Sequence, residues 1–238
     1  MKQPRYILAF IRHAEYDQRP NTPSALQSGA LTPIGLQQSR DAAYQLQAFL
    51  TENTLSLCPQ IECSNALRAW QTADIIQSAL QPEHSNALTV HIDPSLHERS
   101  VGIMANLTIK EIENYLAQDP RVASPPKNWK SDSHYCLPCE GAESLMQAGE
   151  RVKTTITRHF NALTQHNHSQ VKVMVGHGAA FRHAAHLIGL LKFDEIALLS
   201  MHHATPLFFE YCPSSNQWQK IAGEWKNRST INNTSLID

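Results

Sequence analysis

The alternation of short apolar runs with longer amphipathic segments constrains the fold most. Residues 6–11 (YILAFI) form a continuous apolar run, typical of a strand buried on both faces. Similar strand-like runs occupy 60–63, 88–92 and 171–175. Helical periodicity covers 32–51, 66–80, 143–166 and 179–191. Because parallel strands need a helical crossover, this order predicts an α/β fold, a three-layer α/β/α sandwich with a mainly parallel central sheet.

Local signals mark where two of these helices begin. Thr32 followed by Pro33 is typical of a helix start, with threonine at the cap and proline at the first helical position. Ser64 and Asn65 offer capping side chains before the second helix, in which we expect Trp70 to face the core.

The stretch 101–140 interrupts the alternation. Prolines recur through it, and only 109–116 has helical periodicity. Long irregular inserts are usually binding loops or lids, so we expect a lid insert here. Two closing strands are expected at 207–212 and 218–222. The chain then becomes polar, which predicts one domain over 1–226 and a polar C-terminal tail over 227–238.

The balance of charge excludes some classes of function. Lys+Arg number 20 and Asp+Glu 21, so the formal net charge is -1. Binding to nucleic acid or to an anionic membrane surface needs an excess of cations, so neither partner is expected. No apolar run is long enough for a membrane span or an export signal, and the cysteines are scattered. We therefore expect free thiols and a cytoplasmic location.

Cationic or potentially cationic side chains follow three of the expected strands. Arg12 and His13 follow the first strand, Arg68 opens the helix after the second, and His177 stands between two glycines after 171–175. The carboxyl ends of parallel strands meet at one edge of a sheet, where ligands bind. Cations gathered there repel one another unless they bind an anion, and phosphate suits both arginines and a helix N-terminus.

A histidine in a phosphate site indicates phosphoryl transfer. Neutral imidazole is a competent nucleophile near pH 7, and arginines can stabilise the charge on the transferred group. The leaving oxygen also needs a proton. Glu98 is the first candidate donor, although Glu111, Glu113 and Glu140 lie in the same region. The residues alone leave open which histidine attacks.

Six blocks, in order, resemble the histidine phosphatase superfamily (phosphoglycerate-mutase-like). Residues 11–15 (IRHAE) are similar to its RHG signature. The further blocks are 31–37 (LTPIGLQ), 64–73 (SNALRAWQTA), 96–102 (LHERSVG), 141–144 (GAES) and 175–178 (VGHG). Each block alone is a weak signal, whereas the ordered set, spread over about residues 5–212, is specific.

The resemblance implies a role for each central residue. His13 would be the nucleophile that becomes a phosphohistidine. Glu98 would protonate the leaving group and then activate water. Arg12, Arg68 and His177 would bind the phosphoryl oxygens, and His177 also belongs to the catalytic set. The resemblance implies no metal and no cofactor.

Departures from the family pattern favour a phosphatase over a mutase. Ala14 replaces the usual glycine after the histidine. Tyr16 and Arg19 stand where the mutase has a serine and an asparagine, and Val101 stands where it has a tyrosine. We expect Tyr16, Arg19 and His203 to lie on the substrate side of the site.

The leading hypothesis is a metal-independent phosphatase whose substrate is a phosphorylated small molecule or a phosphoprotein. One alternative is a cofactor-dependent phosphoglycerate mutase, whose paired substrate-binding arginines the insert lacks. The insert has only separated cations, namely Arg121, Lys127 and Lys130. The other alternative is a non-catalytic, phosphate-binding regulatory protein. The sequence carries no signal for the oligomeric state.

Other histidines and cysteines have spacings that metal sites use. His183 and His186 share a helical face, and Cys136 and Cys139 have zinc-like spacing, but neither pair has the partners that a metal site needs. We interpret them as ordinary side chains and predict no metal site. Trp129 in the insert could stack on a substrate or anchor the insert to the core.

Overall fold

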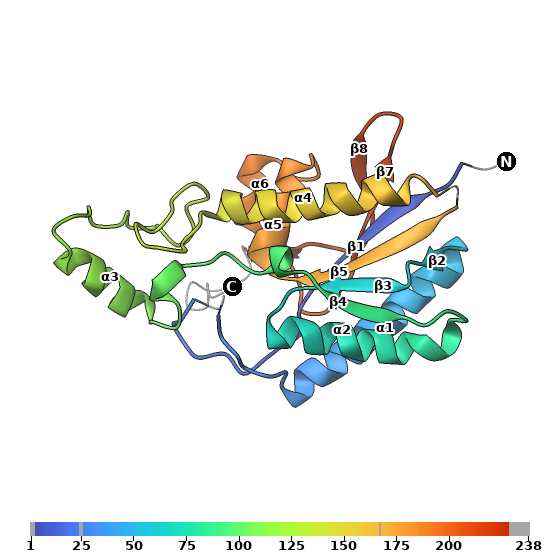
Figure 1. Cartoon of the computed structure of the whole chain (residues 1–238), viewed down its shortest axis with the longest axis horizontal. Helices are drawn as coiled ribbons and strands as arrows, with labels where there is room; N and C mark the ends of the chain where they lie inside the picture. Colours follow the sequence, from blue (N-terminus) through green and yellow to red (C-terminus); the bar gives the residue numbers. More distant parts are fainter. Residues whose placement is uncertain (1–2, 24–25, 167, 229–238) are drawn as a thin grey trace.

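The computed structural model describes residues 3–23, 26–166 and 168–228 (Figure 1). The main sheet has the strand order β4-β3-β5-β1-β7-β8, and a short β2 also pairs with β5. Its strands are β1 (Tyr6–Arg12), β2 (Ser56–Leu57), β3 (Gln60–Cys63), β4 (Thr89–Ile92), β5 (Gln170–Gly176), β7 (Leu207–Cys212) and β8 (Gln217–Ala222). The first five pair in parallel, and the closing hairpin is antiparallel. The sheet is mainly parallel, as the sequence predicts.

Helices cover both faces of this sheet (Figure 1). They are α1 (Pro33–Asn53) and α2 (Leu67–Leu80) on one face, and α4 (Leu145–Leu163) and α5 (Gly178–Leu187) on the other. Successive side chains of β1 divide between them, because Ile7 and Ile11 pack with α1 and α2 whereas Leu8 and Phe10 pack with α4 and α5. Both faces of β1 are therefore buried, which explains its continuous apolar run and confirms the three-layer sandwich.

The helix starts follow the sequence signals in part. The Thr32 hydroxyl accepts a hydrogen bond from the Gly35 N–H, and Pro33 opens α1 as predicted. The start of α2 differs, because its cap is Ala66, with no side-chain hydrogen bond. The prediction that Trp70 faces the core was wrong, since Trp70 is 38% exposed. Ala69, one residue earlier, is buried instead, on the same face of the helix as Ala73 and Ile76.

The region after α5 contains elements that the sequence did not predict. α5 ends at Leu187 rather than near 191, and Gly189 adopts a φ of +83°, a left-handed conformation that glycine tolerates. A short helix α6 (Phe193–Leu198) follows, and then β6 (Leu199–Ser200) pairs with β9 (Lys226–Asn227). Asn227, expected to begin the loose tail, thus lies in a strand. Residues 229–238 of that tail lie outside the described residues.

The insert has more structure than a mostly irregular segment. Its helix α3 (Ile109–Gln118) begins with a capping box between Thr108 and Glu111 and projects away from the sheet (Figure 1). A short 3-10 turn occupies Gly102–Met104 in the insert, and two further turns precede the insert, at Gln81–Glu83 and Pro94–Leu96. A small apolar core joins α3 to the rest of the insert, and its buried members are Val101, Ile112, Leu116, Trp129 and Leu137. Trp129, which is 1% exposed, packs inside this small core, so it holds the insert together rather than joining the insert to the core of the main domain.

The described residues include no helix that combines the length and the apolar character needed to cross a lipid bilayer.

Candidate active site

Backbone hydrogen bonds bring three strand ends to one edge of the sheet. The His13 N–H donates to the Gly176 carbonyl over 2.9 Å, and the Ser64 N–H donates to the Val175 carbonyl over 2.9 Å. Parallel pairing of β1, β5 and β3 therefore fixes the relative positions of Arg12, His13, Ser64 and His177. The structure places the predicted central residues together at the edge where ligands bind in such sheets.

The hydrogen bonds of His13 identify which ring nitrogen carries the lone pair. Nδ1 lies 2.8 Å from the Ala14 carbonyl oxygen, which can only accept, so Nδ1 carries the proton. Nε2 then has a lone pair, and the Arg68 Nε–H donates to it over 3.2 Å. Burial, followed by the nearby His177, Arg68 and Arg12, lowers the pKa of His13 well below its usual value. The imidazole is therefore neutral, with Nε2 as its nucleophilic atom.

His177 lies beside His13, with ring centroids 5.0 Å apart. Its Nδ1 is 3.3 Å from Arg68 Nη2, and its Nε2 is 2.9 Å from the Ser64 hydroxyl oxygen. Because the guanidinium can only donate, Nδ1 accepts and Nε2 donates to Ser64. Burial first, and then Arg68, lowers the pKa of His177 well below its usual value. Both imidazoles are neutral.

The two arginines are held by backbone carbonyls. Arg68, which is fully buried, donates from Nη1 to the Gln27 carbonyl over 2.9 Å. Arg12 donates from Nη1 to the Met201 carbonyl over 3.1 Å. Burial is the main cause that lowers the pKa of both groups, but an arginine keeps its charge at neutral pH. The guanidiniums are thus fixed in direction at the edge of the sheet.

A threonine couples the loop after β1 to α2. The Ala14 N–H donates to the Thr72 hydroxyl over 3.0 Å, and that hydroxyl donates to the Arg68 carbonyl over 2.7 Å. Sequence reasoning missed Thr72 as a site residue, although its place one turn after Arg68 was a usable signal. It also missed Gln27, for which the sequence carries no signal, because the contact joins a loop to α2.

Glu98 lies at the N-terminus of α5. Its carboxylate accepts hydrogen bonds from the N–H groups of Ala179 at 3.1 Å, Ala180 at 2.9 Å and Arg99 at 2.9 Å. These bonds hold the carboxylate at the helix end that His177 caps. Two of the three competing carboxylates of the insert have structural partners, since Glu111 caps α3 and Glu113 accepts from the Trp129 indole, and the third, Glu140, is exposed.

The three residues predicted on the substrate side lie in different places. The Tyr16 ring meets the His13 ring edge-on at 5.2 Å and lies under the Arg68 guanidinium. The His203 ring is 5.8 Å from that of His13, and burial, followed by Arg12, lowers its pKa to about 3. Arg19 is exposed and donates to the Asn106 carbonyl over 2.9 Å, so it joins the loop to the insert rather than to the histidines.

The paired histidines have hydrogen-bond partners in the protein, and the cysteine pair is not joined by a disulfide. His183 Nδ1 forms a hydrogen bond with the Ala179 carbonyl, and His183 Nε2 lies 3.1 Å from the Ser133 hydroxyl oxygen. The contact with Ser133 ties α5 to the insert. His186 bonds through Nδ1 to the Leu191 carbonyl. Cys136 and Cys139 remain thiols in the structure.

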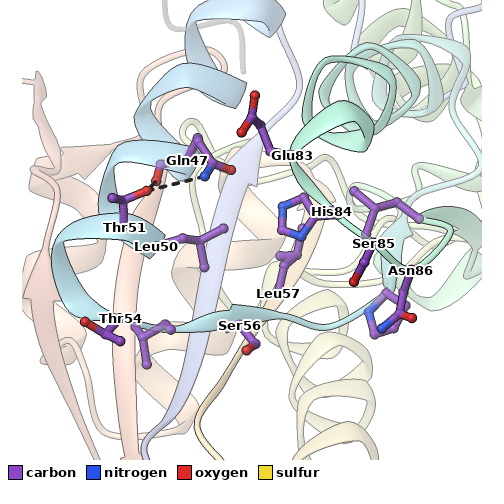
Figure 2. Close-up of a pocket in the computed structure, with 13 residues that line it drawn as sticks. Gln47, Leu50, Thr51, Thr54, Ser56, Leu57, Glu83, His84, Ser85 and Asn86 are labelled. Carbon is purple, nitrogen blue, oxygen red and sulfur yellow. Dashed lines mark hydrogen bonds between the residues drawn. The ribbon is translucent and has the colours of Figure 1, made fainter.

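A cavity of about 470 Å³ opens at the other end of the sheet (Figure 2). Gln47 and Thr51 of α1 line it together with Leu57 of β2 and His84. These residues lie at the amino ends of the strands, whereas His13 and His177 follow the carboxyl ends. The cavity is therefore separate from the candidate active site.

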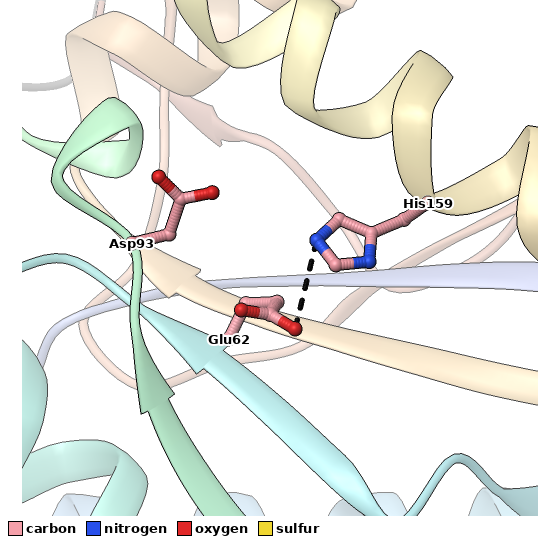
Figure 3. A group of neighbouring side chains, drawn as sticks. All are labelled: Glu62, Asp93 and His159. Atoms are coloured by element: carbon pink, nitrogen blue, oxygen red, sulfur yellow. Dashed lines mark ion pairs between the residues drawn. The ribbon is translucent and has the colours of Figure 1, made fainter.

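Two buried carboxylates, Glu62 and Asp93, meet basic side chains beneath α4. We call this group the Glu62 network; its other members are the buried Lys172, the half-buried His159 and the exposed His91 and Arg158. Glu62, Asp93 and His159 lie close enough together to ligate a metal ion (Figure 3). However, Lys172 Nζ is 2.7 Å from Glu62 Oε1, and Arg158 Nη2 is 2.6 Å from Asp93 Oδ2. These two cations already supply the positive charge, so the group forms an ion-pair network.

Comparison with known proteins agrees with this architecture. Two similar solved structures are a mycobacterial glucosyl-3-phosphoglycerate phosphatase in complex with VO3 (TM-score 0.68, 21% identity, 92% of this chain and 99% of that chain covered) and the alpha-ribazole phosphatase from Shigella flexneri (TM-score 0.65, 20% identity, 95% and 98% covered). At this level of identity the likeness shows a shared fold. No curated protein matches the sequence significantly.

The family is shown by the sequence profile rather than by these structures. The profile of the histidine phosphatase superfamily (branch 1) matches residues 8–222. This range includes all six sequence blocks and ends with the last residue of β8. The chain therefore belongs to the histidine phosphatase superfamily.

Proposed function

We propose that this protein is a metal-independent phosphatase that hydrolyses a phosphomonoester through a covalent phosphohistidine on His13. The observation that carries the proposal is the neutral His13 imidazole, whose Nε2 lone pair faces Arg68 and lies beside His177. A nucleophile, fixed cations and a nearby carboxylate are the groups that phosphoryl transfer needs.

The first step transfers the phosphoryl group to the enzyme. His13 Nε2 attacks phosphorus, the bond between phosphorus and the leaving oxygen breaks, and Glu98 gives that oxygen its proton. The N–H groups of Arg12 and Arg68 bind the equatorial oxygens, where charge accumulates, and His177 binds a further oxygen. The product alcohol leaves a phosphohistidine on the enzyme.

The second step restores the free enzyme. Glu98, now ionised, takes a proton from a water molecule, which attacks phosphorus and breaks its bond to Nε2. Inorganic phosphate leaves, and Glu98 is protonated again for the next turnover. The neutral state of His13, maintained by burial and by neighbouring cations, makes its nitrogen both the attacking atom and a good leaving group.

Three further observations support a phosphatase. The superfamily match covers most of the chain, and two similar structures are named as phosphatases. Tyr16 and Val101 also replace residues of the mutase pattern. We propose a phosphorylated small molecule or a phosphoprotein as substrate and a cytoplasmic location, and the net charge of -1 argues against nucleic acid or a membrane surface as partner.

The proposal is tested by aryl phosphate turnover in the presence of a chelator. Wild type should release phosphate, whereas His13→Ala should not, and the exposed His168→Ala is the matched control. Quenching wild type during turnover should trap a phosphoryl group that is stable to alkali and lost in acid. Equal activity of wild type and His13→Ala, or turnover that the chelator abolishes, contradicts the proposal.

A further inference from the structure

The insert contains a pair of thiols that the proposed reaction does not use. Cys136 and Cys139 are separated by Leu137 and Pro138, and no disulfide joins them. Two cysteines at this spacing can form an intramolecular disulfide, because the ring that closes contains only two intervening residues. The pair is suited to thiol–disulfide chemistry if the backbone turns one cysteine towards the other.

A tight turn of the backbone meets that condition. The Cys139 N–H donates to the Leu137 carbonyl over 2.8 Å, which makes an inverse γ-turn with Pro138 at its centre. The ring of Pro138 fixes φ near the value that this turn requires. Cys136 Sγ lies 3.5 Å from the same carbonyl oxygen. Both cysteines therefore contact one oxygen atom, which brings them together across the turn.

The two thiols differ in their access to solvent. Cys136 is exposed, whereas Cys139 is half-buried. Burial raises the pKa of Cys139, so this thiol forms a thiolate less readily than an exposed cysteine does. An oxidant in solution therefore meets Cys136 first, and Cys139 is placed to complete the reaction.

Cys139 also contributes to the base of the insert. Segments 100–103 and 139–143, which we call the stem, pair through a bridge between Val101 and Ala142. Cys139 Sγ lies 3.4 Å from the Val101 carbonyl oxygen, so its S–H donates to that oxygen. A disulfide has no S–H. Oxidation of Cys139 therefore removes a contact between the two halves of the stem.

We propose that Cys136 and Cys139 form a thiol–disulfide exchange site, at which a small disulfide such as glutathione disulfide joins them and thereby loosens the stem. The Cys136 thiolate attacks one sulfur of the small disulfide and expels a thiolate, which takes up the proton that Cys136 released. The Cys139 thiolate then attacks the Cys136 sulfur of this mixed disulfide and expels the second thiolate. Two cysteine thiols are oxidised, and one small disulfide is reduced to two thiols.

The position of the stem connects this chemistry to the candidate active site. The stem begins two residues after Glu98, and the small apolar core of the insert includes Val101. Glu98 itself is held by the N–H groups of α5, which the stem does not supply. Oxidation should therefore free the insert, and so change access to the site, without displacing the residues around His13.

Mass spectrometry tests whether the bond forms. The full chain with Cys212→Ser, which removes the exposed cysteine of the β7–β8 hairpin, is equilibrated with mixtures of reduced and oxidised glutathione and quenched in acid. The product should be two hydrogen atoms lighter than the reduced protein, with the bond mapped between Cys136 and Cys139. Adding Cys139→Ser should stop the reaction at the mixed disulfide on Cys136. A chain that stays reduced in oxidised glutathione, or that keeps glutathione on Cys136 beside a free Cys139, overturns the proposal.

Hydrogen exchange tests whether the bond loosens the stem. Stem amides should exchange roughly twofold to tenfold faster in the disulfide form than in the reduced form, the effect of one lost hydrogen bond, whereas β1 amides should exchange alike in both. Cys139→Ser treated in the same way retains a donor to Val101 and should show no faster exchange. Stem exchange that is unchanged by the disulfide, or an equal change in β1, overturns the proposal. Neither measurement depends on catalysis, so failure here leaves the proposed function standing.

Discussion

Two regions of this protein bury charged side chains, and those side chains have different kinds of partner in each region. In the Glu62 network each carboxylate meets a cation, Glu62 with Lys172 and Asp93 with Arg158. In the active site, Arg68 donates to two neutral imidazoles and a backbone carbonyl. Removing one partner of a matched buried pair leaves an uncompensated charge, whereas a guanidinium whose N–H groups point at the two imidazoles places its charge where a phosphoryl group would bind. The contrast separates a structural cluster from a binding site without reference to any relative.

The sharpest test of this contrast removes an active-site cation. Arg68→Ala should lower kcat/KM for an aryl phosphate by about a thousandfold, because loss of one preorganised donor costs roughly 10²–10³ and Arg68 contacts both imidazoles. Arg68→Lys should recover little of this, since a lysine cannot reproduce the fork of donors. Steady-state kinetics measure the effect. A loss below tenfold would place Arg68 outside the phosphate site.

Removing a cation from the Glu62 network should affect folding instead. Lys172→Met leaves the buried Glu62 carboxylate without its ammonium partner and should lower the free energy of unfolding by about 3–5 kcal/mol. The double variant Glu62→Leu/Lys172→Met should regain much of this loss. Urea denaturation gives the energies, and kcat of the folded protein should stay near wild type. A double variant as unstable as the single one contradicts the pairing.

Acid should destabilise the protein through its buried neutral histidines. The pKa of His203 is about 3 in the folded state, below its usual value of 6.5, so near pH 5 the unfolded chain binds more protons. The contribution of His203 is complete above pH 6.5 and declines as the pH falls towards the folded value. Between pH 7 and pH 5 it should decrease by about 2 kcal/mol.

Urea denaturation at the two pH values measures this loss of stability. His203→Gln should lose less stability than wild type over the interval, by the amount that His203 contributes. Identical losses in the two proteins would show that His203 does not remain neutral on folding.

The smallest expected effect concerns a positioning residue. Thr72→Val removes the acceptor of the Ala14 N–H and should lower kcat/KM about tenfold, the effect of one lost hydrogen bond, while KM changes little. Thr72→Ser keeps the hydroxyl and should restore most of the activity. A purely structural role predicts a lower unfolding temperature with unchanged kcat, so thermal unfolding is measured alongside the kinetics.

Local patterns predicted the parts of the fold that local forces decide. The apolar run of β1, the Thr32–Pro33 start of α1 and the helix at 109–116 all depend on neighbours in sequence, and all were confirmed. Trp70 was assigned to the core because it is large and apolar, but the buried face of α2 includes its neighbour Ala69 instead. A shift of one residue turns a helical side chain by about 100°.

Contacts between distant segments account for what the sequence could not predict. The β6–β9 pair joins two-residue strands from opposite sides of the closing hairpin, and such short strands have no periodicity to read. Gln27 and Met201 serve the site only through their carbonyl oxygens, which every residue possesses. The strand-end residues were predictable because parallel topology alone brings them together, whereas Glu98 needed its contacts with α5 to be distinguished from the other carboxylates.

The hydrogen bond from His13 to Gly176 has a consequence for how activity fails under stress. This bond continues the hydrogen-bond ladder between β1 and β5, so the two imidazoles keep their spacing for as long as these strands stay paired. The insert, by contrast, has its own small core and can open without disturbing that ladder. On gradual heating, discrimination among substrates should be lost first, and hydrolysis should persist until the whole molecule melts.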